Sequence, residues 1–242
     1  MQRILSRVRR CVDDYRMIEA GEEISVGVSG GKDSLLALAA LARLREFYPV
    51  PFTLSALTLD MGMPGMDFAP VGAFCERLGV PWKRVEAPIY EIVFSVRQES
   101  NPCSLCAKMR RGALNTALRE AGVRKIALGH HRDDATETLL MNLLFEGRIG
   151  CFQPVTYLDR TGITQIRPLL YLEEREIREA AERLQLPVVP NTCPADGGTR
   201  REEVKRLIAA LEGTYPELKT KLFGAMQRFP LPGWGTEGTQ GQ

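Results

Sequence analysis

The stretch ISVGVSGGKDSLLAL, residues 24–38, decides the fold of this 242-residue chain. A short β-branched run leads into Ser-Gly-Gly-Lys-Asp-Ser, and an apolar, helix-forming run follows. A strand that feeds a glycine-rich turn and then a helix presents backbone N–H groups and a positive helix end to an anion. The two glycines let the backbone approach that anion closely. The stretch therefore predicts a phosphate-binding loop, with Ser29, Gly30, Gly31, Lys32, Asp33 and Ser34 as its candidate ligands.

The spacing of the glycines excludes the two most familiar nucleotide loops. A Walker A loop needs a glycine five residues before the Gly-Lys pair, and Val26 stands there instead. The dinucleotide fingerprint needs Gly-x-Gly-x-x-Gly, which residues 27–31 do not supply. The loop is therefore a phosphate site of another kind.

Strand-like and helix-like segments alternate along the chain, which predicts an α/β fold: a parallel sheet flanked by crossover helices. We expect strands at 23–29, 52–60, 81–88, 125–130 and at the start of 162–170. We expect helices at 3–20, 34–47, 67–78, 103–120, 133–146, 173–185, 200–212 and 216–228. The pattern indicates one domain over residues 1–229, followed by a flexible tail at 230–242 that is rich in Gly and polar residues.

The composition is that of a soluble globular protein, with 44% apolar and 26% charged residues. No apolar run is long enough to span a membrane, and residues 1–18 lack the apolar core of a secretory signal. We therefore expect a cytoplasmic protein with no membrane partner. The net charge of +2 neither requires nor excludes a nucleic-acid partner, because binding depends on local basic patches.

Three of the six cysteines form a candidate metal or redox site. Cys103 and Cys106 lie at i and i+3 at the start of a predicted helix, where the helix end and nearby cations favour thiolates. With Cys193 they make three thiol ligands without an evident fourth, which suits a [4Fe–4S] cluster with one open iron. His130 or His131 could instead complete a zinc site. The remaining cysteines are expected to be buried: Cys11, Cys75 and Cys151.

Polar residues at the ends of two predicted strands are further site candidates. Gly129, after the fourth strand, permits close approach of a ligand, and His130 follows it. Asp133 and Asp134 could cap the next helix, or an acid there could hold Mg²⁺ beside a bound phosphate. Asp60 ends the second strand, at the edge where open α/β sheets bind ligands.

The motif SGGKDS resembles the PP-loop of the N-type ATP pyrophosphatases, and longer blocks narrow the resemblance. Over about residues 20–230 the chain is similar to the tRNA 2-thiocytidine synthetases of the TtcA type. The blocks that carry this resemblance are PCSLCAKMRRGAL, IALGHHRDDATETLLMNLLFEGRI, IRPLLYLEEREI, LPVVPNTC and LFGAMQRFP. Related thiouridine synthetases carry terminal zinc fingers, and the chain lacks the additional Cys-x-x-Cys pairs these need. It also departs from many TtcA-type relatives in one respect, because the region of its last cysteine keeps a single thiol.

The resemblance implies an adenine nucleotide α-hydrolase-like fold, ATP with Mg²⁺ at the loop, and a [4Fe–4S] cluster on Cys103, Cys106 and Cys193. It implies that a tRNA cytidine is adenylated and then thiolated, with sulfur from a donor such as a cysteine desulfurase. The family is often dimeric, but the residue pattern itself shows no interface. Basic clusters would contact the tRNA backbone: Arg7, Arg9 and Arg10; Lys108, Arg110 and Arg111; Arg200, Arg201, Lys205 and Arg206.

The candidate catalytic residues are therefore Lys32, Asp33, Cys103, Cys106 and Cys193. The candidate ATP-binding residues are Ser29, Gly30, Gly31, Lys32, Asp33, Ser34, Asp60, Gly129, His130 and Asp133. Two alternatives stay open. One is an adenylating enzyme with another acceptor, such as a lysidine-synthetase-like enzyme, whose activity would not need the cysteines. The other is a nucleotide-binding sensor that releases no pyrophosphate.

Overall fold

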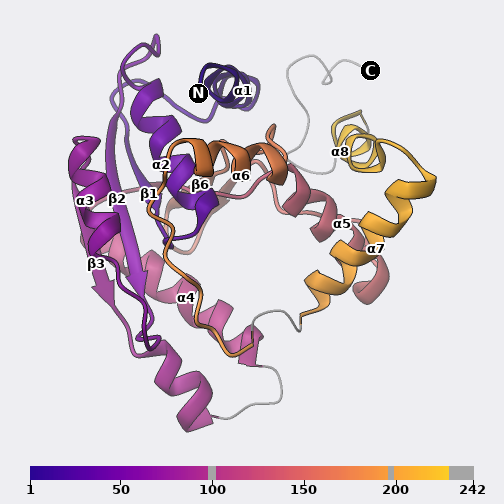
Figure 1. Ribbon diagram of the computed structural model, residues 1–242. Helices are drawn as coiled ribbons and strands as arrows, with labels where there is room; N and C mark the ends of the chain where they lie inside the picture. The colour runs from indigo at the N-terminus through magenta and orange to yellow at the C-terminus, as the bar shows by residue number, and fades with distance from the viewer. Residues whose placement is uncertain (98–101, 196–198, 229–242) are drawn as a thin grey trace.

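The protein is built on a six-stranded sheet with the order β3-β2-β1-β4-β6-β5, seen in a computed structural model that describes residues 1–97, 102–195 and 199–228 (Figure 1). The strands are β1 (Glu23–Gly27), β2 (Thr53–Asp60), β3 (Trp82–Glu86), β4 (Lys125–Ala127), β5 (Val155–Leu158) and β6 (Ile163–Ile166). All neighbouring strands run parallel except β5, which pairs antiparallel with β6 at the sheet edge. The predicted α/β class with a parallel sheet is confirmed, and the short β5 is an element that the sequence pattern did not predict.

The helices follow the predicted order with shifted ends. They are α1 (Gln2–Asp14), α2 (Lys32–Leu44), α3 (Ala69–Arg77), α4 (Pro102–Glu120), α5 (Arg132–Glu146), α6 (Glu174–Arg183), α7 (Arg200–Thr214) and α8 (Leu218–Arg228), with a π-helix, η1 (Glu91–Arg97), that was not predicted. The first helix was expected to reach residue 20 but ends at Asp14. It ends there because Arg16 takes a left-handed conformation, with φ of 47°, and reverses the chain. The predicted tail at 230–242 lies outside the described residues.

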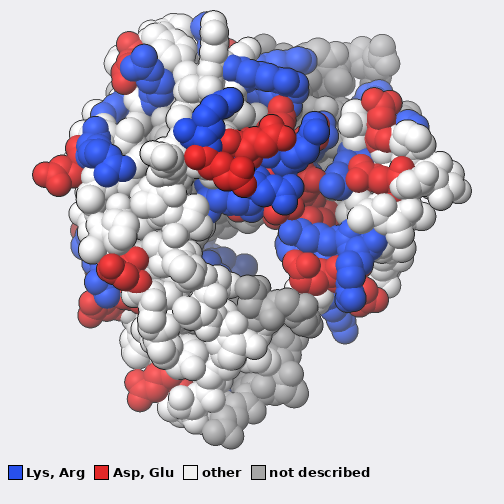
Figure 2. All heavy atoms as spheres, in the orientation of Figure 1, with Lys and Arg blue, Asp and Glu red and all other residues white. Residues whose placement is uncertain are grey.

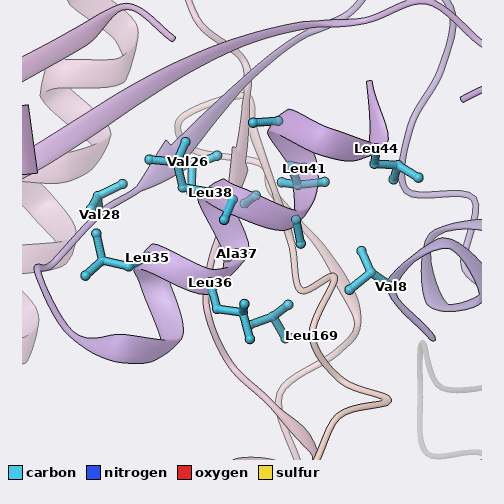
Figure 3. Packing of buried hydrophobic residues seen from close by; sticks show 14 of the residues in the cluster. Val8, Val26, Val28, Leu35, Leu36, Ala37, Leu38, Leu41, Leu44 and Leu169 are labelled. Atoms are coloured by element: carbon cyan, nitrogen blue, oxygen red, sulfur yellow. The ribbon is translucent and has the colours of Figure 1, made fainter. Parts of the chain in front are cut away.

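Helix α2 occupies the centre of the core. Five leucines on it are completely buried, and four alanines between them allow close packing: Leu35, Leu36, Leu38, Leu41, Leu44, Ala37, Ala39, Ala40 and Ala42. Figure 3 shows Val8 of α1 and Leu169, from the segment after β6, lying near these leucines. The opposite face of the sheet carries a second cluster, in which Leu118 of α4 packs with Ile126 and Ile163. Helices α2 and α4 therefore pack in separate apolar clusters on the two faces of the sheet.

The strand order reverses at β1, which lies between β2 and β4. Open α/β sheets bind ligands at such a switch point, beyond the carboxyl ends of the strands. The loop that follows β1 is the predicted phosphate loop, and it leads directly into α2. In the part of the chain that the structure describes, no helix is long and apolar enough to cross a membrane.

Candidate active site

The predicted phosphate loop folds back on itself through its two serines. The backbone N–H of Ser29 donates to Ser34 Oγ at 3.1 Å, and that hydroxyl donates to the Gly31 carbonyl at 2.9 Å. Gly30 takes φ of +85°, and its carbonyl accepts a bond from Val189 N–H at 2.9 Å. A Cβ on Gly30 would lie 2.9 Å from Val189 Cβ, so only glycine fits. The segment after α6 is thereby fixed against the loop.

Gly129 brings a second segment against the same loop. A Cβ at this position would lie 2.8 Å from both Asp33 C and Ser34 N, which are backbone atoms of the first turn of α2. A side chain of any size would push the two segments apart. The sequence therefore needs glycine here for the close approach of two pieces of the protein, in addition to any approach of a ligand.

The Lys32 amine is held between two carboxylates. Its Nζ lies 3.2 Å from Asp33 and 3.2 Å from Glu174 Oε1, at the start of α6. Burial disfavours the charged amine, but Asp33 and Glu174 outweigh it and raise the pKa of Lys32 above its usual value. Lys32 is therefore a fixed cation at the mouth of the loop. Glu174 was not among the predicted site residues.

The two histidines have different surroundings. His131 is buried, with Nε2 3.3 Å from Asp134 Oδ2, and it forms a capping box with Asp134 at the start of α5. The ring of His130 packs on Phe152 with centroids 4.9 Å apart. Burial lowers the pKa of His130 to about 4, and Arg167 adds to the effect, so His130 is neutral at pH 7. An uncharged His130 can offer a phosphate a hydrogen bond but no positive charge.

The predicted acids at the strand ends already have protein partners. Asp133 is buried, with one oxygen 2.8 Å from Lys219 Nζ and the other accepting Glu174 N–H at 2.8 Å. Burial raises the pKa of Asp133, but these partners outweigh it and lower the pKa below its usual value. Asp60 pairs with Arg84, and its other oxygen accepts Gly62 N–H at 2.9 Å. Both side chains thus hold neighbouring segments in place.

A cavity of about 380 Å³ lies at the carboxyl ends of the strands and joins the phosphate loop to α4. Ser29 lines it on the loop side, and Ala107, which follows Cys106, lines it on the α4 side. Its other polar walls are His130, Gln165, Arg110, Arg111 and Arg167, and its apolar walls include Leu57, Leu59, Met61, Met66, Phe68 and Leu128. Mostly apolar walls with a few convergent polar groups are typical of small-molecule sites.

The three predicted cluster ligands come from two segments. Cys103 and Cys106 lie in the first turn of α4, and Cys193 lies in the segment after α6 (Figure 1). Burial raises the pKa of Cys106 above the usual value, Arg110 lowers it, and the neighbouring Cys193 and Cys103 raise it further. Arg110 thus favours the thiolate of Cys106, as expected of a nearby cation, but burial and the other two thiols outweigh it. Two of the cysteines expected to be buried, Cys11 and Cys75, are buried, and Cys151 is half-buried.

Thiol donors suit iron and other soft metals. Within residues 1–97, 102–195 and 199–228, however, no three His, Cys, Asp or Glu side chains lie together in a group that could hold a metal ion. The cluster ligands therefore stay a prediction.

The predicted basic clusters are only partly available to a partner. On α7, Arg201 lies 3.0 Å from Glu137 Oε2 and Lys205 lies 3.4 Å from Glu174 Oε2, so both turn inward. Arg110 and Arg111 line the cavity. Figure 2 shows a hollow near the centre of the molecule with basic and acidic side chains crowded on its rim, over α6 and α7. Some of the predicted basic residues thus line the cavity or pair with acidic residues inside the protein, which leaves fewer of them for the tRNA backbone.

The sequence reasoning missed Glu174, Arg167 and Phe152. Arg167 is buried, stacks over the Phe152 ring at 4.9 Å and donates to the Thr156 hydroxyl at 3.0 Å. The sequence did hold a sign that Arg167 is a site residue, because in IRPLL, residues 166–170, a charged residue stands between an apolar strand and a proline. The acidic start of the helix expected at 173–185 was the signal for Glu174, but acidic residues are favoured at helix N-termini whether or not they belong to a site.

Comparison with known proteins gives consistent matches. The family model of the PP-loop domain matches residues 2–210. The chain is 37% identical to the tRNA-cytidine(32) 2-sulfurtransferase of Dechloromonas aromatica over 223 residues, which cover 91% of this chain and 78% of that protein. It is also 37% identical to the protein of that name from Anaeromyxobacter dehalogenans, over 93% of this chain and 78% of that one. A solved structure, the U34-tRNA thiolase NcsA from Methanococcus maripaludis with its [4Fe–4S] cluster, superposes with a TM-score of 0.73 at 26% identity, covering 91% and 75% of the two chains.

Proposed function

Because the chain belongs to the PP-loop domain family and, within it, to the tRNA-cytidine(32) 2-sulfurtransferases, we propose that it is an ATP-dependent enzyme that converts a tRNA cytidine to 2-thiocytidine. The observation that carries the proposal is the cavity with Ser29 of the phosphate loop on one wall and the neighbour of Cys106 on another. Thiolation needs an activated oxygen and a source of sulfur. The phosphate loop on one side of the cavity suits the activation, and the cysteine segment of α4 on the other side suits the delivery of sulfur.

The phosphate loop would bind ATP and activate the base. The C2 carbonyl oxygen of cytidine attacks the α-phosphorus, an O–P bond forms, and the bond to pyrophosphate breaks. The loop N–H groups and Lys32 would stabilise the charge on the leaving pyrophosphate. Asp33 is a carboxylate next to Lys32, and its oxygens fit a Mg²⁺ ion that accompanies the phosphates.

Sulfur would then replace the activated oxygen. A C–S bond forms at C2, the C–O bond breaks, and AMP leaves with the oxygen. Cys103, Cys106 and Cys193 would hold a [4Fe–4S] cluster, which when bound would supply iron able to carry sulfur at the sulfide level. Sulfur that a donor such as a cysteine desulfurase delivers as a persulfide would first have to be reduced to that level by an external two-electron reductant. Cys103 and Cys193 lie close enough to Cys106 to raise its pKa, so the two segments that carry the three thiols are neighbours.

The target base must leave its stack to reach the cavity. Neutral His130 offers a ring edge and Arg110 and Arg111 offer cations, so the walls can receive both a base and its phosphates. A neutral imidazole suits hydrogen bonding to a base better than charge neutralisation.

The test is thiolation of unmodified tRNA by anaerobically prepared protein. We expect AMP, pyrophosphate and 2-thiocytidine in digested tRNA, together with iron bound to the protein. Cys103→Ser and Cys106→Ser should abolish 2-thiocytidine while ATP still binds. Continued activity in these variants would favour an adenylating enzyme with another acceptor, and a colourless protein with one zinc would contradict the cluster.

A further inference from the structure

Glu174 connects the phosphate loop to α7. Its Oε1 lies 3.2 Å from Lys32 Nζ, and its Oε2 lies 3.4 Å from Lys205 Nζ. All three side chains are about one-third exposed, so a bound anion can reach both ion pairs. The carboxylate thus joins the lysine of the loop to a lysine that comes 173 residues later in the chain.

The backbone of Glu174 is fixed although its side chain is not. Glu174 N–H donates to the buried Asp133 carboxylate at 2.8 Å, and Lys219 neutralises that carboxylate at 2.8 Å. Glu173 and Glu176 form a capping box around the same turn. Only the side chain of Glu174 is therefore free to change partner.

A carboxylate and a phosphate make the same kind of charge-assisted bond to an ammonium group. Pyrophosphate bound in the loop would therefore compete with Glu174 for Lys32. Lys205 offers the displaced carboxylate a second cation without any backbone movement.

We propose that Glu174 is a positioning residue for the ATP step: it holds Lys32 at the loop and shifts onto Lys205 when the phosphates of ATP take its place. The inference rests on the proposed function, because it needs ATP at this loop. It gives Lys205 a role in ATP binding, separate from contacts with the tRNA backbone.

The proposal predicts opposite effects for the two partners. Glu174→Gln removes the competing charge, so ATP should bind roughly two- to fivefold more tightly, the range of a partly exposed ion pair. Its pyrophosphate release per enzyme should nevertheless fall, because Lys32 is no longer held in place. Lys205→Met leaves Glu174 with Lys32 alone, so ATP should bind more weakly by a similar factor. In the double variant the effect of Lys205→Met should disappear.

The experiment measures binding of an ATP analogue with a methylene bridge between the α- and β-phosphorus atoms, with Mg²⁺ and without tRNA. Glu179→Gln, which changes an exposed carboxylate on the same helix, is the matched control and should bind like wild type. Thermal melting of each variant checks folding, and turnover is measured separately with tRNA.

The proposal is supported if ATP-analogue affinity rises in Glu174→Gln and falls in Lys205→Met, and if Lys205→Met has no effect in the double variant. Unchanged affinity in Glu174→Gln, or weaker binding in both single variants, overturns it and leaves the proposed function intact. Failure of the wild-type protein to bind the analogue overturns the proposed function and this inference together.

Discussion

Replacing Gly129 by alanine should damage the phosphate loop without removing any group that contacts a ligand. The new Cβ would lie 2.8 Å from Asp33 C and Ser34 N, so these backbone atoms must retreat by about 0.6 Å to reach 3.4 Å, where ordinary van der Waals contact begins. They cannot move freely, because buried Leu35 and Leu36 fix the turn that follows. Overpacking of this kind costs about 1–3 kcal/mol of unfolding free energy.

The effect on activity should exceed the effect on stability. A misplacement of about 1 Å can lower catalysis by roughly 100-fold, so we expect pyrophosphate release to fall on the order of 10- to 100-fold. The assay is pyrophosphate release with tRNA, alongside urea denaturation. Gly213→Ala is the matched control, because a Cβ there meets no atom within 4 Å. If Gly129→Ala keeps wild-type turnover and ATP affinity, the close approach does not govern the loop and the reasoning is refuted.

Two ionisable groups of α5 give predictions on stability. Lys219→Met leaves the buried carboxylate of Asp133 without its cation, which should cost about 1–3 kcal/mol at pH 7. Because the folded pKa of Asp133 lies below its usual value, the difference in unfolding free energy between Lys219→Met and wild type should shrink as the pH falls through that folded pKa. A difference that stays constant with pH in urea denaturation would contradict the pairing. Burial raises the pKa of Glu137 from 4.5 to about 7, so the unfolded chain ionises first and stability should fall as the pH rises across that interval. Glu137→Gln should flatten this dependence, and equal slopes in the two proteins would exclude Glu137 as its cause.

The order of elements was predictable because each follows from a local pattern. The run around SGGKDS combines strand, turn and helix signals, and the observed β1 and α2 follow it closely. β5 is only four residues long and pairs antiparallel with β6, so its place depends on a partner that no local pattern reveals. The left-handed turn at Arg16 is likewise set by tertiary packing, since arginine has no preference for that conformation.

The site was predictable to the level of its segments, but less so to the level of single side chains. The GHHRDD block does lie against the loop, yet its two histidines differ in kind: His131 caps a helix and His130 lines the cavity. Adjacent residues on an extended segment point in opposite directions, and the sequence alone does not tell which one faces the ligand. Glu174 lies 142 residues from Lys32 along the chain, and only the fold brings them together.

Asp60 illustrates how a site residue can act through its neighbours. One of its oxygens is engaged by Arg84 and the other by Gly62 N–H, so its bonding capacity toward ATP is largely used within the protein. Those bonds fix the turn after β2, and Met61 and Met66 on either side of that turn line the cavity. A carboxylate at the end of the strand therefore shapes an apolar wall through the backbone that it anchors. Direct contact of Asp60 with ATP stays a prediction, whereas loss of its carboxylate should loosen this wall whether or not ATP touches it.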